Sequence, residues 1–579
     1  METPYDSRPW LRFYPEGVPA EVDVPVVPLT TLLDDAVASF PRRRAVAFLG
    51  WTTTYRKLAR DVDRFAGALR GLGVHRGDRV ALIMPNCPQQ VIAFYAVLRR
   101  GGVVVQHNPL YTASELQYQL ADSGARVAIV LDRMYPTMAA ARRGTAVEHV
   151  VVTSLMEYLP ASKRLLLKLP VEKAAEAREE LEAEVPEEAP VLFFQELLRS
   201  SKSQHHQIPV DPTRDLAALQ YTGGTTGRPK GAKLTHYNLV ANAYQVQAWD
   251  PACRPGQEVG LGVLPLFHVF GLTLCLAACV LLGGTLVLVP KFDLDLVFSA
   301  IRRWKPTIFP GVPPIYQQIA ESPRARSVRL DSIRTCVSGA MTLPRQTVDH
   351  FRRVTGGAEV VQGYGLTEAS PVVMANPLDG NARHISVGLP MPNTDARIVD
   401  ENDPRRPVSV GQAGELIIRG PQVFAGYWNQ PKETDEVLVN GWLRTGDVAM
   451  MSPDGYFTLI DRKRDVIIVD GFNVYPSEVE DVLNAHPAVK DCAIIGIPHD
   501  RRGEVVKAYV IPAPSYEPTG KELSRFCQKR LTGYKVPAII EFRDELPRNM
   551  IGKVLRRVLR EQHEQGQASP FPAQPAPGP

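Results

Sequence analysis

Residues 78–109, DRVALIMPNCPQQVIAFYAVLRRGGVVVQHNP, follow a pattern that returns in residues 258–290, EVGLGVLPLFHVFGLTLCLAACVLLGGTLVLVP. Both stretches run from a strand through a proline and an apolar helix to a Gly-Gly pair, a second strand and a second proline. Strand-like segments at 79–84 and 126–131 lie on either side of a helical segment at 88–100, so strands and helices alternate. This alternation predicts an α/β fold with parallel sheets between helices, and the repeat predicts two similar α/β halves.

The composition is that of an ordinary globular protein. Of 579 residues, 45% are hydrophobic and 22% are charged, and the length suggests about three or four folding units. Lys and Arg exceed Asp and Glu by only four (66 against 62), which gives no global basic field, so we expect no nucleic-acid partner. The seven cysteines form no C-x-x-C pair, a pattern typical of reduced thiols.

The first residues, METPYDSRPWLRFYPEG, contain no apolar run of the kind that a secretory signal needs, so we expect a cytoplasmic protein. Residues 259–290 carry no charged side chain, and this stretch is long enough to cross a bilayer. Pro265, His268 and Gly283-Gly284 interrupt it, however, and residues 285–289 favour a strand. We therefore interpret it as a strand, a buried helix, a turn and a strand.

Residues 155–173, LMEYLPASKRLLLKLPVEK, are both apolar and basic. One interpretation is an ordinary surface insertion. The alternative is a peripheral contact with a membrane surface, in which Lys163, Arg164 and Lys168 face lipid phosphates and residues 165–167 enter the lipid. The sequence leaves both interpretations open.

The strongest chemical signal lies between the two repeats, at residues 221–231, YTGGTTGRPKG. Its glycines let backbone N–H groups approach phosphate oxygens, the hydroxyls of Thr222, Thr225 and Thr226 add donors, and Lys230 adds a positive charge. No G-x-x-x-x-G-K-[ST] sequence occurs in the chain, so this loop is not the Walker loop of P-loop nucleotide hydrolases. It predicts a phosphate site of another class.

This loop resembles that of a superfamily of acyl-adenylate-forming enzymes: the acyl- and aryl-CoA synthetases, the luciferases and the adenylation domains of peptide synthetases. The beginning, RPWLRFYPEGVPAEVD, and the run NGWLRTGDVAMMSPDGYFTLIDRKR are similar to bacterial long-chain fatty acyl-CoA ligases in particular. Six further motifs resemble those of the superfamily, in the same order: LPLFHVFG (264–271), VQGYGLTE (361–368), GELIIRGPQVFAGYW (414–428), NGWLRTGD (440–447), DRKRDVIIVDGFNVYPSEVE (461–480) and LPRNMIGK (546–553).

The resemblance implies three regions along the chain. A large N-terminal domain, residues 1–460, would hold two similar α/β subdomains and a small β-barrel-like part, and would bind ATP and the acyl substrate. A small mobile α+β domain would follow over residues 461–560, with a hinge at Asp461 and the catalytic Lys553. Residues 561–579, which end in GQASPFPAQPAPGP, are expected to form a disordered tail.

The implied activity is the ATP-dependent ligation of an acid to coenzyme A. The carboxylate attacks the α-phosphate of ATP, pyrophosphate leaves, and the CoA thiol then displaces AMP from the acyl-adenylate. Attack of one anion on another requires cations, so Mg²⁺ is expected beside ATP. The resemblance assigns catalysis to Thr222, His268, Glu368 and Lys553, the metal to Glu368 and Thr225, and contacts with ATP or CoA to Thr222, Gly223, Gly224, Thr225, Thr226, Gly227, Lys230, Ala340, Gln362, Gly363, Tyr364, Gly365, Thr367, Asp447, Arg462, Gly471, Phe472 and Asn473.

Single residues in these motifs have chemistry that suits the implied roles. The cation of Lys553 would hold the carboxylate and the α-phosphate during adenylation. A carboxylate such as Asp447 can accept hydrogen bonds from both ribose hydroxyls, with Arg462 beside it. Glu368 is an oxygen ligand of the kind that Mg²⁺ prefers, and Tyr364 would lie against adenine.

Other assigned residues keep an ordinary alternative. Gly471, Phe472 and Asn473 would border the tunnel of the CoA pantetheine arm, although a simple turn explains the glycine equally well. His268 is expected to line the pocket near the substrate carboxylate, but a lone histidine in an apolar segment is often a core residue.

The segment VSGAMTLP, residues 337–344, departs from the glycine-rich pattern of the superfamily. Ser338 stands where glycine is usual. This departure leaves the adenine contact of Ala340 open.

A medium- or long-chain fatty acid is the expected substrate, because the aliphatic run after His268 and the N-terminal motif both indicate one. An aryl-acid CoA ligase shares every catalytic motif, and an acyl-AMP ligase that loads a carrier protein differs only in its second acceptor. A fatty-acid capture protein that has lost its ATP chemistry is the alternative outside the enzymes. The expected partners are therefore the fatty acid, ATP and CoA, while the chain length and the oligomeric state stay open.

Overall fold

The computed structural model describes residues 3–186, 191–204, 207–222, 229–326, 328, 330–401, 403–469, 472–499, 502–514, 516–549, 552–566 and 574–575. The chain divides into two compact units. The large unit comprises Trp10–Asp395 and Ile418–Leu443, and the small unit comprises Met1–Pro9, Ala396–Ile417 and Arg444–Pro579. The predicted domain boundary between residues 460 and 461 stays a prediction.

The sequence repeat forms the same structural unit twice in the large unit. In the first copy, β3 (Arg79–Ile83), α3 (Pro88–Arg99) and β4 (Val103–Gln106) follow one another, and β3 pairs with β4 in parallel. In the second copy, β10 (Val259–Gly262) and β11 (Thr285–Leu288) also pair in parallel. The helix between them has three sections: α10 (Val269–Gly271), the π-helical η4 (Leu272–Ala277) and α11 (Ala278–Leu281). The predicted pair of α/β halves is confirmed.

The interpretation of residues 259–290 as strand, helix, turn and strand is confirmed by the same elements. In the part of the chain that the structure describes, no helix has both the length and the apolar character that a bilayer crossing requires.

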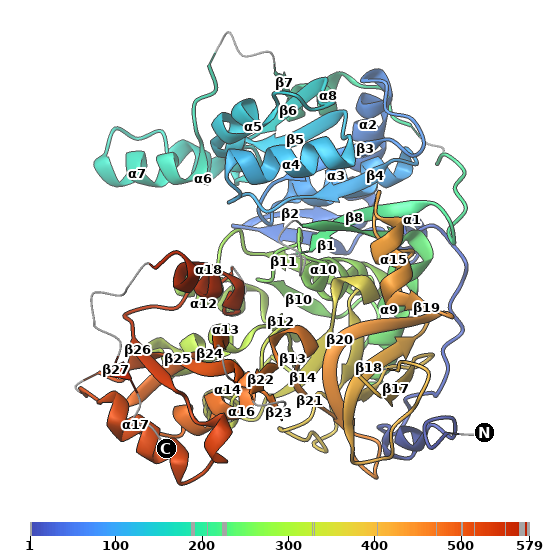
Figure 1. The fold of residues 1–579 in the computed structure, drawn as a ribbon. Helices are drawn as coiled ribbons and strands as arrows, with labels where there is room; N and C mark the ends of the chain where they lie inside the picture. Colours follow the sequence, from blue (N-terminus) through green and yellow to red (C-terminus); the bar gives the residue numbers. More distant parts are fainter. Residues whose placement is uncertain are drawn as a thin grey trace. The chain divides into compact units, whose positions relative to one another are not determined.

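The first half of the large unit is built on a seven-stranded sheet of order β7-β6-β5-β3-β4-β8-β9 (Figure 1). Its strands pair in parallel, apart from the antiparallel pair β8–β9. One face packs on α4 (Ala113–Ser123) and α5 (Tyr135–Ala141) through side chains such as Ala81 and Leu120. The remaining strands are β5 (Val127–Leu131), β6 (His149–Thr153), β7 (Leu192–Phe193), β8 (Leu216–Thr222) and β9 (Lys230–Thr235).

The second half is built on a nine-stranded sheet of order β16-β15-β14-β13-β12-β10-β11-β1-β2. The strands from β14 to β1 pair in parallel, while β2, β15 and β16 are antiparallel additions at the two edges. Their bounds are β1 (Arg44–Phe48), β2 (Trp51–Thr54), β12 (Ile308–Gly311), β13 (Thr335–Ser338), β14 (Glu359–Gly365), β15 (Val372–Ala375) and β16 (Leu389–Pro390).

Local signals explain where the helices of the large unit begin. The side chain of Thr112 accepts a hydrogen bond from the N–H of Glu115 at the start of α4, and Thr235 caps α9 in the same way through Asn238. The further helices are α1 (Thr30–Ser39), α2 (Tyr55–Gly71), α6 (Ala161–Leu166), α7 (Glu172–Leu181), α8 (Phe194–Ser200), α9 (His236–Trp249), α12 (Leu294–Trp304), α13 (Pro313–Glu321), α14 (Arg345–Thr355) and α15 (Pro431–Val437).

A five-stranded sheet has the order β17-β18-β20-β19, with β21 beside β20. Its strands are β17 (Asp395–Val399), β18 (Ala413–Arg419), β19 (Leu438–Val439), β20 (Trp442–Met451) and β21 (Phe457–Arg462). β20 and β21 carry two of the residues assigned to ribose.

The small unit holds a six-stranded sheet of order β23-β22-β25-β26-β27, with β24 beside β25. Successive side chains of β24 point to opposite faces of this sheet and so belong to two separate parts of the core of the small unit. Cys492 and Ile494 join one apolar cluster, while Ala493 and Ile495 join another that includes Leu559 of α18. The elements are β22 (Ile467–Val469), β23 (Phe472–Val474), α16 (Pro476–Asn484), β24 (Val489–His499), β25 (Gly503–Pro512), α17 (Gly520–Gln528), β26 (Ile539–Phe542), α18 (Arg556–Glu564) and β27 (Gln574–Pro575).

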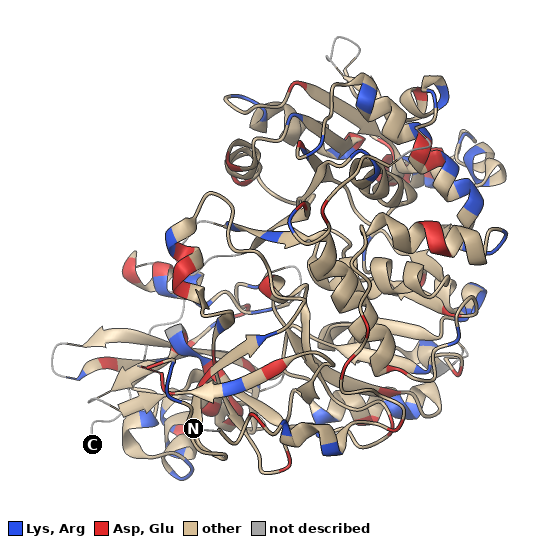
Figure 2. Cartoon of the chain, turned by 90° about the vertical axis from the view of Figure 1, so that its right-hand side faces the viewer, with Lys and Arg blue, Asp and Glu red and all other residues tan. Residues whose placement is uncertain are grey.

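The disordered tail that the sequence predicts over 561–579 stays a prediction. Residues 561–564 form the end of α18, and residues 567–573 and 576–579 lie outside the described residues. Positive and negative side chains are interspersed along the described chain (Figure 2).

Candidate active site

The ends of the predicted phosphate loop are held by two antiparallel strands. Thr222, the last residue of β8, lies opposite Lys230, the first residue of β9. The hydroxyl of Tyr221 donates a hydrogen bond of 2.7 Å to the Asp122 carboxylate, which holds the end of β8. The turn itself, with Gly223, Gly224, Thr225, Thr226 and Gly227, lies outside the described residues, so the phosphate and metal contacts assigned to it stay predictions.

Tyr427 connects two residues that the sequence assigns to ATP and Mg²⁺. Its hydroxyl donates a hydrogen bond of 2.7 Å to Oε1 of Glu368, and the Nζ atom of Lys230 lies 5.2 Å from the centre of its ring. Residues 424–428 are held against β9 by backbone hydrogen bonds, such as Trp428 N–H to the Gly231 carbonyl at 2.7 Å. The fold therefore brings Lys230 and Glu368 together around one phenol ring.

This arrangement suits a magnesium ion that is also bound by phosphates and water. The phenol of Tyr427 engages one oxygen of Glu368, and a carboxylate has acceptor sites on both oxygens. Among the residues that the structure describes, no group of three or more His, Cys, Asp or Glu side chains could hold a metal ion. Mg²⁺ is commonly bound through one or two carboxylates together with substrate phosphates, so Glu368 fits that mode.

The end of β14 and the loop after β13 lie side by side. Ser338 pairs with Gln362, and the Gln362 side chain accepts a hydrogen bond of 3.1 Å from the Leu343 N–H, which holds the loop. Ala340 in this loop is exposed and has φ +69°, a left-handed conformation that costs a residue with a side chain. Tyr364 is buried, at 7% exposed.

The glycines of the β14 motif make room for backbone. A Cβ atom on Gly365 would lie 2.1 Å from the Pro371 carbonyl oxygen, so no other residue fits there without movement. A Cβ on Gly363 would lie 3.3 Å from Val337, which is a tight contact. Thr367 and Glu368 follow in the short helix η6 (Thr367–Ala369), so the fold presents both after the end of β14.

His268 caps the helix that follows β10. Its Nδ1 atom accepts a hydrogen bond of 3.2 Å from the Phe270 N–H, so Nε2 is the atom that can carry the proton of the neutral ring. Desolvation lowers the pKa of His268 to about 4, and the imidazole is therefore neutral near pH 7. Its position as cap is structural, and the assigned role near the substrate carboxylate stays a prediction.

In the small unit, the two residues assigned to ribose face each other across a pair of strands. Asp447 of β20 pairs with Arg462 of β21, and Arg462 Nε lies 2.5 Å from Asp447 Oδ1. Only 5% of the Asp447 side chain is exposed. The arginine thus holds the carboxylate in one orientation, while the planar carboxylate keeps further acceptor sites for hydroxyl groups.

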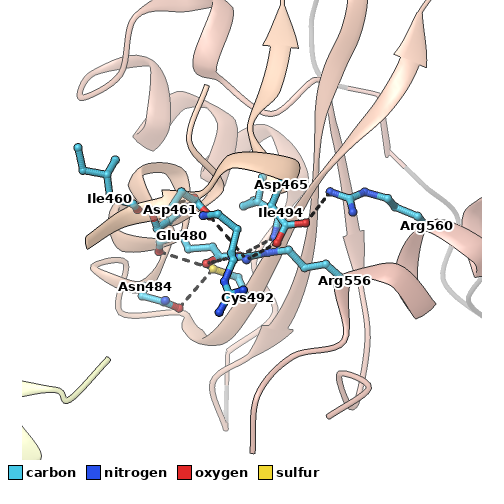
Figure 3. A network of polar contacts seen from close by, with 11 residues as sticks. Ile460, Asp461, Asp465, Glu480, Asn484, Cys492, Ile494, Arg556 and Arg560 are labelled. Carbon is cyan, nitrogen blue, oxygen red and sulfur yellow. Dashed lines mark hydrogen bonds and ion pairs between the residues drawn. The ribbon is translucent and has the colours of Figure 1, made fainter. Parts of the chain in front are cut away.

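Asp461, the predicted hinge, is held by polar contacts within the small unit. Its Oδ2 atom accepts hydrogen bonds from the N–H of Ser477 at 2.8 Å and from its hydroxyl at 3.0 Å. Its Oδ1 atom lies 3.9 Å from Nη1 of Arg556. Figure 3 shows this contact as part of a larger network in which Arg556 also contacts Glu480 and Asp465.

Lys553 lies just before that arginine, in a loop stabilised by its own backbone. The Lys553 N–H donates a hydrogen bond of 2.8 Å to the Asn549 side chain, and the Asn549 N–H donates to the Lys553 carbonyl at 2.9 Å. Residues 550–551 between them lie outside the described residues. The side chain of Lys553 is partly exposed, as a group that contacts a substrate must be.

The residues assigned to the CoA arm are partly described. Phe472 is 57% exposed and stacks on Tyr534 with ring centres 4.9 Å apart. Asn473 is exposed beside it, whereas Gly471 lies outside the described residues. An exposed aromatic stack is a suitable wall for a narrow, partly apolar arm.

An apolar cavity of about 60 Å³ lies in the large unit against the nine-stranded sheet. Its walls come from β10, β12 and β13 of the sheet and from α9, η4 and α11. Neither this cavity nor Tyr427 was identified from the sequence. The sequence signal for Tyr427 is its place in the motif GELIIRGPQVFAGYW. Its partner Glu368 is 59 residues away along the chain, so the contact itself has no local signal.

Two parallel α/β halves, a glycine-rich sequence between β8 and β9, and Lys230 and Glu368 around the Tyr427 ring are together typical of an enzyme that acts on a nucleotide. The chain belongs to the AMP-binding enzyme family, whose sequence profile matches residues 33–428. The profile of the AMP-binding enzyme C-terminal domain matches residues 478–553. The resemblance inferred from the motifs is confirmed.

Known relatives are similar over nearly their whole length. The chain is 42% identical over 557 residues to a long-chain-fatty-acid–CoA ligase of Bacillus subtilis, covering 96% of this chain and 98% of the relative. It is 38% identical to a feruloyl-CoA synthase of Amycolatopsis, covering 90% and 96%. The solved structure of the anthranilate CoA ligase AuaEII in complex with anthranoyl-AMP superimposes with a TM-score of 0.81 at 27% identity, covering 94% and 99%.

Proposed function

We propose that this protein is an ATP-dependent fatty-acid CoA ligase that works through an acyl-adenylate and releases AMP and pyrophosphate. The observation that carries the proposal is the similarity, over 96% of the chain, to a relative named as a long-chain-fatty-acid–CoA ligase. The charged residues that the chemistry needs, Lys230, Glu368, Asp447 and Lys553, are all present. A capture protein without ATP chemistry would have no use for this set.

In the first half-reaction, a carboxylate oxygen of the acid attacks the α-phosphorus of ATP, and the bond to pyrophosphate breaks. Lys553 contributes a positive charge that stabilises the charge shared between the carboxylate and the α-phosphate. Lys230 and the loop ends bind the phosphates that leave, while Asp447 and Arg462 orient the ribose. Glu368 would hold a Mg²⁺ ion, which would supply positive charge beside the phosphates.

In the second half-reaction, the CoA sulfur attacks the acyl carbon, the bond to AMP breaks, and the thiol proton is lost to the medium. Phe472 and Asn473 border the path of the pantetheine arm in this proposal. The two half-reactions need different groups at one acyl carbon, so Asp461 acts as the hinge of a small domain that changes its position between them.

A fatty acid is favoured over an aryl acid by the relatives, because the chain is 42% and 39% identical to two proteins named as long-chain-fatty-acid–CoA ligases. The feruloyl-CoA synthase similarity keeps the aryl acid as the second candidate.

The test is a hydroxylamine trap of the adenylate, with octanoate, hexadecanoate and ferulate as acids. With ATP and Mg²⁺ we expect fatty hydroxamates and pyrophosphate, and with CoA we expect the thioester and AMP. Adenylate without thioester would favour transfer to a carrier protein. Larger rates with ferulate would favour the aryl acid, and no hydroxamate from any acid would contradict adenylation itself.

We further propose a peripheral membrane contact through α6 and the residues that follow it. Leu165, Leu166 and Leu169 are 70%, 60% and 49% exposed, and Lys163 and Lys168 lie beside them. In Figure 1, α6 and α7 project from the edge of the seven-stranded sheet. Exposed leucines among basic residues are typical of a surface that enters the headgroup region of an anionic bilayer.

Replacing Leu165, Leu166 and Leu169 together by serine should weaken binding to anionic vesicles on the order of tenfold or more, because each leucine loses apolar burial in the lipid. Vesicle sedimentation at low and high salt measures the effect. Leu110, which is 66% exposed elsewhere in the large unit, provides the matched control as Leu110→Ser. Equal binding by the triple variant and the wild type would contradict the contact.

A further inference from the structure

The apolar cavity of the large unit borders a polar cluster of two buried carboxylates and Arg334, whose side chain is 36% exposed. Asp250 and Glu258 line it together with Thr335, and both carboxylates are buried, at 7% and 5% exposed. Arg334 binds Asp250 through Nη1 at 2.7 Å and Glu258 through Nη2 at 3.1 Å. The Thr335 hydroxyl donates to Asp250 at 2.6 Å. The cluster therefore adds a polar border to an otherwise apolar space.

Strand register gives the direction of the cavity along the sheet. Thr335, Ile308 and Gly260 form one row across β13, β12 and β10 and line the cavity near the cluster. Ser338, three residues further along β13, pairs with Gln362 in the row at the carboxyl ends of the strands. Three residues of strand span about 10 Å. The polar cluster thus lies about 10 Å along the strands from the sheet edge at which Ala340 and Glu368 follow their strands.

Other lining residues of the cavity lie on β15, beside the end of β14 at that same edge. Val372 and Ala375 line it, and these residues pair with Gly365 and Gly363 of β14, next to Tyr364. In open α/β sheets, ligands bind at the carboxyl ends of the strands. A substrate whose carboxylate lies at that edge would direct its tail along the face of the sheet toward the cluster.

We infer that this cavity receives the end of the acyl chain and that Asp250, Glu258 and Arg334 set the longest chain that the protein accepts. The inference rests on the proposed function. One more methylene in an apolar wall improves binding about fourfold. Forcing the cluster apart leaves a buried charge without its partner, which costs on the order of a hundredfold to a few thousandfold. Extension past the cluster is therefore unfavourable.

The cavity must still widen to hold more than a narrow tail, and its walls permit this. Leu274 of the π-helical η4 and Met391 both line the cavity. Methionine is unbranched and adapts its shape readily, and π-helical turns are frequent at functional sites. The apolar walls can adjust, whereas the cluster is fixed by its ion pairs.

Gly260 offers a direct test of the cavity floor. A Cβ atom added at Gly260 would contact only Cys279, with its Sγ atom 3.6 Å away, which is an ordinary van der Waals distance. Gly260→Val therefore adds bulk without a backbone clash. We expect kcat/KM for hexadecanoate to fall about tenfold or more while octanoate changes by less than about twofold. Ala278→Val fills the same cavity from α11 and should shift the preference in the same direction.

The control is Cys336→Ala, a core change on the same sheet. Cys336 is buried between the cavity-lining residues Thr335 and Val337 and points to the opposite face of β13. Its ratio of hexadecanoate to octanoate activity should equal that of the wild type. An unchanged ratio in both cavity variants, or an equal loss with every acid, would overturn the inference. A wild type that activates ferulate and no fatty acid would instead overturn the proposed function.

Discussion

Replacement of Lys553 by alanine should lower the rate of adenylation by about a hundredfold to a thousandfold, the effect of removing one group that stabilises charge in a transition state. The carboxylate and the α-phosphate are both anions, so their approach depends on a cation held between them. The thioester half-reaction, started from supplied acyl-adenylate, has no such approach of anions. It should keep most of its rate.

The fold of the loop should survive this substitution. The contacts that hold Lys553 to Asn549 use the Lys553 backbone N–H and carbonyl, both of which alanine retains. Lys521→Ala, at an exposed lysine of the same unit, is the matched control and should leave both half-reactions unchanged. Pyrophosphate release measures the first half-reaction, and thioester formation from acyl-adenylate measures the second. Equal losses in both would contradict the role of Lys553.

The sequence predicts the α/β core because the signals for that core are local. Residues 78–109 carry an uninterrupted apolar strand, a proline at the helix start and a Gly-Gly turn, and each gives the element expected. The second copy does the same over residues 258–290. Buried parallel strands need apolar side chains on both faces, so their pattern is visible without knowledge of their partners.

What the sequence does not reveal depends on contacts between distant residues. Tyr427 meets Glu368 because residues 424–428 bond to β9 and the Phe424 N–H donates to the Glu368 carbonyl at 2.9 Å, and nothing near Tyr427 in the chain indicates these contacts. The cavity is likewise a space left between strands of the nine-stranded sheet and the helical segments α9, η4 and α11. Its size depends on how those elements pack, which composition and periodicity do not fix.

The π-helical section of the helix after β10 is a further example. The apolar run predicts a helix, but residues 272–277 have the wider π geometry. Thr273 in this section donates a hydrogen bond of 2.6 Å to the Ser370 carbonyl, a contact across 97 residues. A local pattern predicts that a helix forms, while its detailed geometry responds to such tertiary contacts.

The polar network around Arg556 should contribute strongly to the stability of the small unit. Arg556 Nη2 lies 2.8 and 2.7 Å from the two oxygens of Glu480, and Nη1 lies 3.5 Å from Asp465 (Figure 3). Glu480 also accepts a hydrogen bond of 2.9 Å from the Ile494 N–H of β24. The network therefore ties α18, which begins just after Lys553, to α16 and to the sheet.

Arg556→Met should lower the local stability of the small unit by about 3–5 kcal/mol, because it leaves a buried carboxylate without its partner. Amide hydrogen exchange in β24 and β25 of the intact chain measures this loss directly. Arg557→Met is the matched control, since Arg557 is adjacent, 57% exposed and paired along the helix with Glu561. Its effect should stay within about 0.5 kcal/mol.

The pH dependence and a second substitution separate charge from packing. Burial raises the pKa of Glu480 even with Arg556 in place, and loss of the arginine should raise it further. A carboxyl whose pKa is higher in the folded state binds more protons there than in the unfolded state. It therefore destabilises the folded state increasingly as the pH rises from the unfolded-state pKa through the folded-state pKa. The loss in Arg556→Met should therefore be smaller at pH 5 than at pH 7. Adding Glu480→Gln should recover part of it. A loss that is the same at both pH values and in the double variant would mean that Arg556 acts through packing of its side chain and not through its charge.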